Sequence, residues 1–140
     1  MSNSRRSRIV NLDEIREEGR GALAVASYGR HVPFVVRRTF LIHEIPAGIV
    51  RGSHAHHRCE QFLLCVSGAI ELVAEDAAGT TTYHLSEPNQ GLYVPALTWL
   101  ELMPVEAQTM IVVLASDEFD EADYIRDRTA FETLMAEACP

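Results

Sequence analysis

The sequence RGSHAHHRCEQ at residues 51–61 carries more structural information than any other part of the chain. Its histidines His54 and His56 are two residues apart in a segment with the character of a strand. Side chains of a strand alternate between its two faces, so both imidazoles point to the same side. We therefore expect the pair to face one cavity. Ser67 and Gly68 are expected to end the next strand in a hairpin turn.

The segments on either side predict a series of short β-strands. Residues 34–45 are rich in β-branched and aromatic side chains, and residues 69–75 alternate as a half-buried strand does. Turn-forming residues such as Pro46, Gly48 and Gly79 separate these segments. We expect strands at residues 23–27, 34–45, around the histidine pair, and at 61–66, 69–75, 80–85, 90–94, 98–103 and 109–115.

Only the C-terminal end of the chain predicts a helix. Phe131, Leu134, Met135 and Ala138 are spaced i, i+3, i+4 and i+7, which gives one apolar stripe. Eight or nine strands in 140 residues indicate an all-β fold, a small barrel or jelly roll, with this helix packed on its outside. We expect a flexible N-terminal tail at residues 1–10 and a single domain at residues 11–140.

Composition and charge exclude several classes of function. The formal net charge of −8 argues against a protein that coats nucleic acid or binds an anionic membrane surface. All twelve basic residues are arginine, so neither Schiff-base chemistry nor a Walker-type phosphate loop is available. An anionic ligand would have to be bound by a local cluster of arginines.

The cysteines and the N-terminus predict a cytoplasmic protein. Cys59, Cys65 and Cys139 form no C-x-x-C pair and no zinc-finger spacing, so we expect reduced thiols. The arginines near the N-terminus are not followed by an apolar run, so we expect neither a signal peptide nor a membrane span.

The histidine pair is suited to moving protons near neutral pH, because the ordinary pKa of an imidazole is about 6.5. The alternative is that His54 and His56 are hydrogen-bonded polar residues in the wall of a barrel. A nearby anion site is also indicated, because guanidinium groups bind phosphate oxygens in pairs. Arg51 is one candidate, and alternation allows either Arg37 or Arg38 to face inward. Tyr93 and Trp99 are candidate stacking surfaces for a base, and their alternative place is the core.

A metal site is the competing interpretation of the same residues. The spacing of Gly48, His54, His56 and Glu60 is similar to the first motif of the cupins, whose histidines and glutamate usually hold a metal. The second motif, GLYVPALTWLEL at residues 91–102, has no histidine, and Trp99 stands near the place of the last ligand. A metal centre needs at least three firm ligands, and which of Glu60 and Gln61 points inward depends on a one-residue register. We therefore expect no metal and no other cofactor.

Several segments together resemble the sugar-nucleotide 3,4-ketoisomerases, which are cupin-fold enzymes acting on dTDP-4-keto-6-deoxyglucose. The likeness covers nearly the whole chain after the tail. The R-G-x-H-A-H segment with its downstream glutamine, together with the closing YIRD segment, is far more specific than the cupin spacing alone. The matching pieces are Arg20-Gly21, RRTFLI at 37–42, RGSHAHHRCEQFLLCVSG at 51–68, GLYVPALTW at 91–99, LASDEFDEADYIRD at 114–127, and Phe131.

This resemblance implies a metal-independent isomerase. His54 and His56 would move a proton between carbons 3 and 4 of the sugar through an enediol, which gives the 3-keto isomer, a precursor of a deoxyaminosugar. The developing enolate needs a donor or cation beside it, which Arg51 or Arg38 would provide. The resemblance also implies a nucleotide-sugar partner and a homodimer that exchanges an N-terminal strand, here residues 23–27.

The chain departs from the resemblance at one position of the strand before the histidines. Family members tend to have a tyrosine there, whereas this chain reads Phe40, Leu41, Ile42 and His43, so His43 is a candidate replacement. The residues expected to bind the substrate are therefore Arg20, Gly21, Arg38, His43, Arg51, Gln61, Tyr93 and Trp99. Two other functions stay open: a cupin that binds a sugar nucleotide without catalysis, and a metal-dependent cupin oxygenase.

Overall fold

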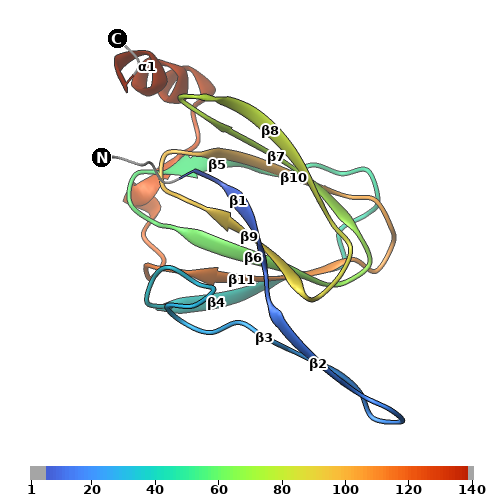
Figure 1. Ribbon diagram of the computed structural model, residues 1–140. Helices are drawn as coiled ribbons and strands as arrows, with labels where there is room; N and C mark the ends of the chain where they lie inside the picture. The colour runs from blue at the N-terminus through green and yellow to red at the C-terminus, as the bar shows by residue number, and fades with distance from the viewer. Residues whose placement is uncertain (1–5, 139–140) are drawn as a thin grey trace.

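The computed structural model describes residues 6–138, and in this part of the chain two five-stranded sheets stack face to face (Figure 1). The first sheet has the strand order β1-β9-β6-β11-β4, and the second has the order β12-β5-β10-β7-β8. The strands of the first are β1 (Arg8–Asn11), β9 (Gln90–Val94), β6 (Gln61–Ser67), β11 (Met110–Ala115) and β4 (Arg38–Ile42). Those of the second are β12 (Tyr124–Ile125), β5 (Arg51–His56), β10 (Trp99–Pro104), β7 (Ile70–Asp76) and β8 (Gly79–Leu85).

The main core lies between the two sheets. The apolar side chains on the inner faces of β6, β9 and β11 meet those of β7, β8 and β10. Leu63 and Leu92 from the first sheet, and Leu72, Leu85 and Leu102 from the second, are all buried there. Because this core lies on one face of each sheet, every second side chain of these strands points into it.

The outer faces are covered by the remaining parts of the chain. The loop before β4 lays Val32 and Phe34 over the outer face of the first sheet, beside Phe62 and Tyr93. Helix α1 (Arg128–Ala138) follows a short 3-10 turn, η1 (Glu121–Asp123). Phe131 of this helix packs against Trp99, with 5.4 Å between ring centroids. The helix therefore covers the outer face of the second sheet at one end.

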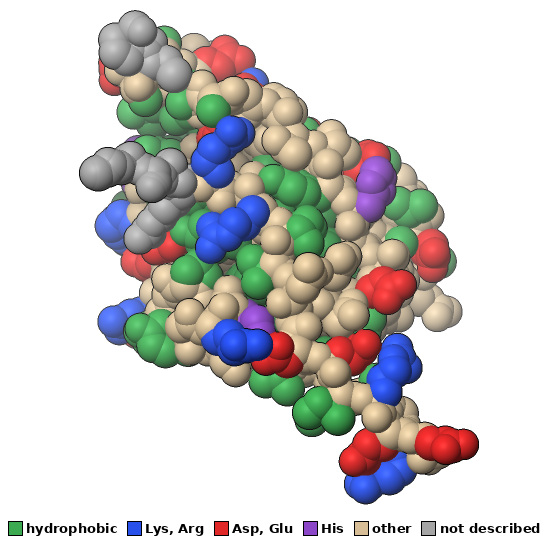
Figure 2. Space-filling view, in the orientation of Figure 1, with side chains coloured by type: hydrophobic (Ala, Val, Ile, Leu, Met, Phe, Trp, Pro, Cys, Tyr) green, Lys and Arg blue, Asp and Glu red, His purple; other side chains and the backbone are tan. Residues whose placement is uncertain are grey.

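A two-stranded ribbon extends away from the sandwich (Figure 1). It consists of β2 (Asp13–Glu17) and β3 (Gly21–Val25), which pair with each other in a separate antiparallel sheet. Figure 2 shows charged side chains gathered at its far end. Two apolar side chains of the ribbon, Ile15 and Leu23, lie opposite each other and are 54% and 58% exposed.

The predicted all-β jelly roll with a C-terminal helix is confirmed, although the two sheets form a sandwich and do not close into a barrel. The strand expected at residues 34–45 is limited to Arg38–Ile42. The segment before it is a loop, because Phe34 packs against Phe62 and Tyr93 on the outer face of the first sheet.

The tail expected at residues 1–10 is wrong for residues 8–10, since β1 pairs along β9. Residues 1–5 of that tail and Cys139 lie outside the described residues. Within the described range, no helix is both long and apolar enough to cross a bilayer.

Candidate active site

Strand β5 brings two imidazoles side by side at one end of the sandwich. The ring centroids of His54 and His56 are 5.2 Å apart and the ring planes are nearly perpendicular, at 83°. The strand is held in place from both sides, because β10 pairs with its first part and β12 pairs Tyr124 with His56. Alternation along β5 therefore produces the shared orientation that the sequence predicted.

His54 lines a cavity of about 240 Å³ between the two sheets. Apolar side chains from both sheets form much of its wall: Phe40, Ile42, Leu63, Leu100, Leu102 and Val113. The polar side chains in the wall are Arg51, His54, Gln61, Tyr124 and Arg126. A cavity of mixed lining with two guanidinium groups is suited to a ligand that has both an apolar part and an anionic part.

The segment after η1 adds two side chains to this cavity. The Tyr124 ring packs against both imidazoles, with centroid distances of 5.0 Å to His54 and 4.4 Å to His56. The Arg126 guanidinium lies 4.1 Å from the centre of the Tyr124 ring, and Glu121 accepts two hydrogen bonds from it at 2.9 and 3.1 Å. Tyr124 therefore shields the histidine pair from one side and places a cation next to it.

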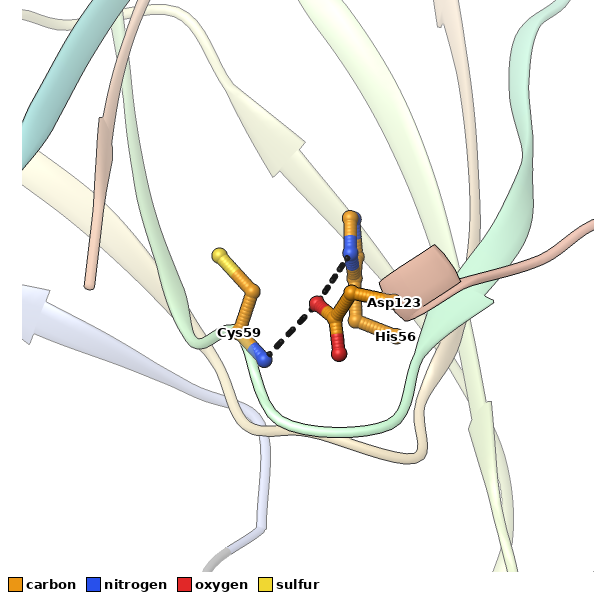
Figure 3. A group of neighbouring side chains, drawn as sticks. All are labelled: His56, Cys59 and Asp123. Carbon is orange, nitrogen blue, oxygen red and sulfur yellow. Dashed lines mark hydrogen bonds and ion pairs between the residues drawn. The ribbon is translucent and has the colours of Figure 1, made fainter. Parts of the chain in front are cut away.

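A buried carboxylate stands behind His56 (Figure 3). Asp123 Oδ2 lies 3.1 Å from His56 Nδ1, and both residues are almost fully buried. Asp123 also accepts hydrogen bonds from the backbone N–H groups of Arg58, at 2.7 Å, and Cys59, at 3.1 Å. Two backbone N–H groups thus hold the carboxylate in place, and Oδ2 can still accept a hydrogen bond from the imidazole.

Burial keeps both imidazoles neutral at neutral pH. Desolvation, together with the charges of His56, Arg126 and Arg51, lowers the pKa of His54 to about 4. Desolvation also lowers the pKa of His56, although the hydrogen bond and the charge of Asp123 oppose this shift. Neutral imidazoles are proton acceptors, which is the state that general base catalysis requires.

Asp123 is ionised in this environment. Burial disfavours its charged form, but the hydrogen bonds from Arg58, Cys59 and His56 outweigh burial and lower its pKa below the ordinary value of 3.8.

The sequence interpretation missed Asp123, Tyr124 and Arg126 as site residues. Asp123 is 67 positions away from His56, so no local periodicity joins the two. The available signal was that residues 114–127 are one of the segments that carry the family resemblance.

Three predicted residues lie close to the histidine pair. Arg51 and Gln61 line the cavity. Arg38 shares the inner face of β4 with Phe40, whose ring centre is 5.1 Å from its guanidinium carbon. Its buried Nε has no hydrogen-bond partner among the described residues, and its charge contributes to lowering the pKa of His56. The structure therefore places Arg38, and not the exposed Arg37, on the inner face.

Three other predicted residues lie elsewhere. Tyr93 is on the outer face of β9 and its hydroxyl donates to Glu60 at 2.5 Å. Trp99 is on the outer face of β10 under α1 and donates to Glu101. His43 follows the end of β4, is half exposed and pairs with Glu44. These three side chains do not line the cavity around His54, because the strand alternation directs their neighbours Leu92, Leu100 and Ile42 inward instead.

Arg20 and Gly21 are not near the histidine pair of the same chain. Arg20 lies in the turn of the projecting ribbon, where it is exposed and pairs with Glu17, and Gly21 begins β3. Neither residue belongs to the cavity wall around His54. Their predicted contact with substrate would therefore require the ribbon of another chain.

The cupin ligand set is not assembled in the described part of the chain. Glu60 is directed to Tyr93, and Gln61 takes the inward position, which settles the one-residue register left open by the sequence. His84 cannot supply the missing ligand, because it is exposed on β8, separated from β5 by two strands, where it pairs with Glu71 of β7. His56, Cys59 and Asp123 offer ligand atoms within 4.8 Å of one another, but the Asp123 carboxylate is already occupied by three hydrogen bonds.

Fold and site together define a jelly-roll protein of the cupin type with a histidine pair next to a cavity between its two sheets. The family model described as "WxcM-like, C-terminal" (FdtA) matches residues 5–136. A curated relative, TDP-4-oxo-6-deoxy-alpha-D-glucose-3,4-oxoisomerase of Aneurinibacillus thermoaerophilus, is 32% identical over 130 residues, which cover 93% of each chain. The chain belongs to this family, and the resemblance to 3,4-ketoisomerases found in the sequence is confirmed.

Solved structures agree with this assignment. A 3,4-ketoisomerase from Helicobacter canadensis is 31% identical, with a TM-score of 0.87, and the match covers 93% of this chain and 97% of that one. QdtA, a sugar 3,4-ketoisomerase from Thermoanaerobacterium thermosaccharolyticum solved in complex with TDP, is 25% identical, with a TM-score of 0.89. That match covers 96% of this chain and 97% of QdtA.

Proposed function

We propose that this protein is a sugar-nucleotide 3,4-ketoisomerase that converts a TDP-4-keto-6-deoxyhexose to its 3-keto isomer. The observation that carries the proposal is the pair of neutral imidazoles, His54 and His56, beside a cavity lined by Arg51 and Arg126. The family relationship supplies the substrate class, because the curated relative is named as a TDP-4-oxo-6-deoxyglucose 3,4-oxoisomerase and QdtA was solved in complex with TDP.

The reaction requires groups that accept and return protons without any change of oxidation state in the protein. One imidazole takes the proton from carbon 3, which is acidic because it lies next to the carbon 4 ketone. The carbon 4 oxygen gains a proton, which gives an enediol. The oxygen on carbon 3 then loses its proton as carbon 4 gains one, and the ketone is now at carbon 3. Two histidines side by side fit these transfers at adjacent atoms.

The arginines around the pair stabilise the negative charge that develops on the oxygen. Arg51, Arg126 and Arg38 all lower the pKa of one of the two imidazoles, so their positive charges act on the atoms at this site. A fixed cation beside an enolate oxygen lowers the barrier to its formation. Arg51 and Arg126 line the cavity and also suit the diphosphate of a nucleotide sugar.

The donor set supports a mechanism without a metal. The glutamate that would complete the cupin ligand set accepts a hydrogen bond from Tyr93 on the opposite face of its sheet. Two histidines alone are fewer ligands than a catalytic metal centre normally has. A metal-dependent oxygenase would show stoichiometric iron or zinc in the purified protein, and metal analysis tests this directly.

We also propose that the active form is a homodimer that exchanges the ribbon of β2 and β3. The ribbon exposes Ile15 and Leu23 and extends away from its own sandwich, which supports a contact with a second chain. Arg20 and Gly21 would then reach the cavity of the partner.

Cys59 and Cys65 are free and buried, which agrees with a reducing, cytoplasmic location.

The test is incubation with TDP-4-keto-6-deoxyglucose in deuterated water. We expect solvent deuterium at carbon 3 or carbon 4, together with the 3-keto product, because each exchange requires a proton to be removed from carbon. Tight binding of TDP and the substrate without any deuterium incorporation would instead identify a sugar-nucleotide-binding protein that is not a catalyst.

A further inference from the structure

We propose that Asp123 is a positioning residue that holds His56 in the tautomer with its proton on Nδ1 and keeps the Nε2 lone pair free for the substrate. This inference rests on the proposed isomerase function. It assigns a role to a residue in the segment after β11, which lies outside the histidine motif in the sequence but in contact with it in the fold.

The position of the Asp123 carboxylate is fixed by the backbone and not by side chains alone. Oδ1 accepts from the N–H of Arg58 and Oδ2 from the N–H of Cys59, both in the loop directly after β5. The Asp123 carbonyl in turn accepts from the N–H of His57 at 2.9 Å. The residue is 2% exposed. The loop that follows the histidine motif therefore donates hydrogen bonds to the same carboxylate that contacts His56.

The direction of the hydrogen bond between the two side chains follows from their charges. Asp123 is ionised and has no proton to donate, so His56 Nδ1 must be the donor. In a neutral imidazole the other nitrogen then carries the lone pair. His56 Nε2 is buried and has no hydrogen-bond partner among the described residues. An unused acceptor at this place is costly unless a ligand completes it.

The same contact also favours the step in which His56 takes up a proton. Uptake at Nε2 creates an imidazolium, whose positive charge lies next to the Asp123 carboxylate at 3.1 Å. Arg38 and Arg126 oppose this charge, and Asp123 raises the pKa of His56 against them and against burial. Asp123 thus controls both which nitrogen of His56 reacts and how readily it does so.

The first measurement reads the tautomer without any substrate. Long-range ¹H–¹⁵N spectra of the full-length protein at neutral pH, with the His56 signals assigned by their loss in His56→Asn, should show the proton on Nδ1. A proton on Nε2 in the wild-type protein overturns the inference, even if the enzyme proves to be an isomerase. Failure of the isomerase function would leave this result unchanged, so the two proposals are separable.

The second measurement compares Asp123→Asn with Asp120→Asn, which changes an exposed carboxylate of the same segment that also contacts Arg58. In Asp123→Asn, the new side-chain amide would donate to Nδ1 and move the proton of His56 to Nε2. We expect kcat to fall by about 10² to 10⁴, the range for a lost general base, with KM and TDP affinity within about threefold of wild type. Asp120→Asn should retain wild-type kcat.

Equal kcat values for Asp123→Asn and wild type, in folded protein, would overturn the role of Asp123. If Asp123→Asn does not fold, Asp123→Glu keeps the charge and moves the carboxylate by one methylene, and it should retain the Nδ1 proton. The wild-type spectrum decides the inference in either case.

Discussion

At the scale of single residues, the chemistry depends on two imidazoles with different surroundings. His54 lines the cavity and is surrounded by His56 and the charges of Arg51, Arg126 and Glu121. His56 is more deeply buried and is paired with Asp123. Environments that separate two titratable groups in this way are typical of sites where one group donates while the other accepts.

Replacing either histidine of the pair should abolish turnover without abolishing binding. In His54→Asn and His56→Asn we expect kcat to fall by about 10² to 10⁴, because general acid and base catalysis contribute about that much. TDP affinity, measured by calorimetry, should stay within about tenfold, because the phosphates would be bound by guanidinium groups and not by the neutral imidazoles. His57→Asn is the matched control, because His57 is exposed on the same segment. Normal turnover in both variants would show that the pair is not the site.

The pH dependence of activity should follow the lowered pKa of His54. Since His54 stays neutral down to a pKa of about 4, kcat/KM should hold as the pH falls through about 6.5 and decline only at more acidic values. Measuring kcat/KM between about pH 4 and about pH 8 checks this. An acid limb centred at about 6.5, the ordinary value for histidine, would contradict the buried environment.

The same pKa shift predicts how stability depends on pH. The folded protein binds a proton at His54 less readily than the unfolded chain, so the contribution of His54 is complete above about pH 6.5. It is lost as the pH falls from there through about 4. Thermal unfolding of wild type and His54→Asn should therefore show a smaller decrease over this range in the variant.

At the scale of elements, the site depends on how closely β5 approaches β10. Gly52 of β5 lies opposite Glu101 of β10, where the register shifts, and has a φ of +87°. A Cβ at this position would lie 2.7 Å from the carbonyl oxygen of Leu100. Only glycine allows both this backbone conformation and this contact. Two elements that line the cavity therefore meet at one residue without a side chain.

Gly52→Ala should reduce both stability and activity, because it strains the backbone and pushes β5 away from β10. Gly48→Ala is the matched control, since Gly48 has a φ of +84° but open space where its Cβ would be. We expect both variants to lose about 1–2 kcal/mol from the left-handed conformation. Only Gly52→Ala should lose further stability and reduce kcat. Equal denaturant midpoints and equal kcat in the two variants would contradict the role of the close contact.

At the scale of the whole molecule, the ribbon of β2 and β3 lies outside the two stacked sheets of its own chain (Figure 1). Ile15 and Leu23 pair across the ribbon and both are more than half exposed. Apolar side chains gathered on such a projection are typical of a surface that contacts another protein. The exposed turn with Arg20 lies at the end of this ribbon.

The wild-type protein should sediment as a dimer of about 31 kDa, twice the 15.6 kDa of one chain. The double variant Ile15→Asp with Leu23→Asp should sediment as a monomer, because two buried carboxylates in the interface are costly. Its kcat/KM should also fall if Arg20 completes the cavity of the partner. Val105→Asp, at an equally exposed apolar residue in a loop, is the control and should remain a dimer. A monomeric and fully active wild type would contradict the proposed exchange.

The sequence by itself determined the class of fold, the positions of most strands, the C-terminal helix and the histidine pair. These features depend on local periodicity, since the alternation along residues 51–56 and the stripe through Phe131 are properties of neighbouring residues. Motif spacing also sufficed to show the resemblance to 3,4-ketoisomerases.

Only the tertiary structure decided which side chains join the pair. Tyr93 and Trp99 lie on outer faces because strand register sends every second residue away from the cavity, and the register of a strand is fixed by its partners. Asp123, Tyr124 and Arg126 enter the site because β12 pairs with β5 across a long separation in sequence. Such a contact has no local pattern, since it arises from the packing of the whole chain.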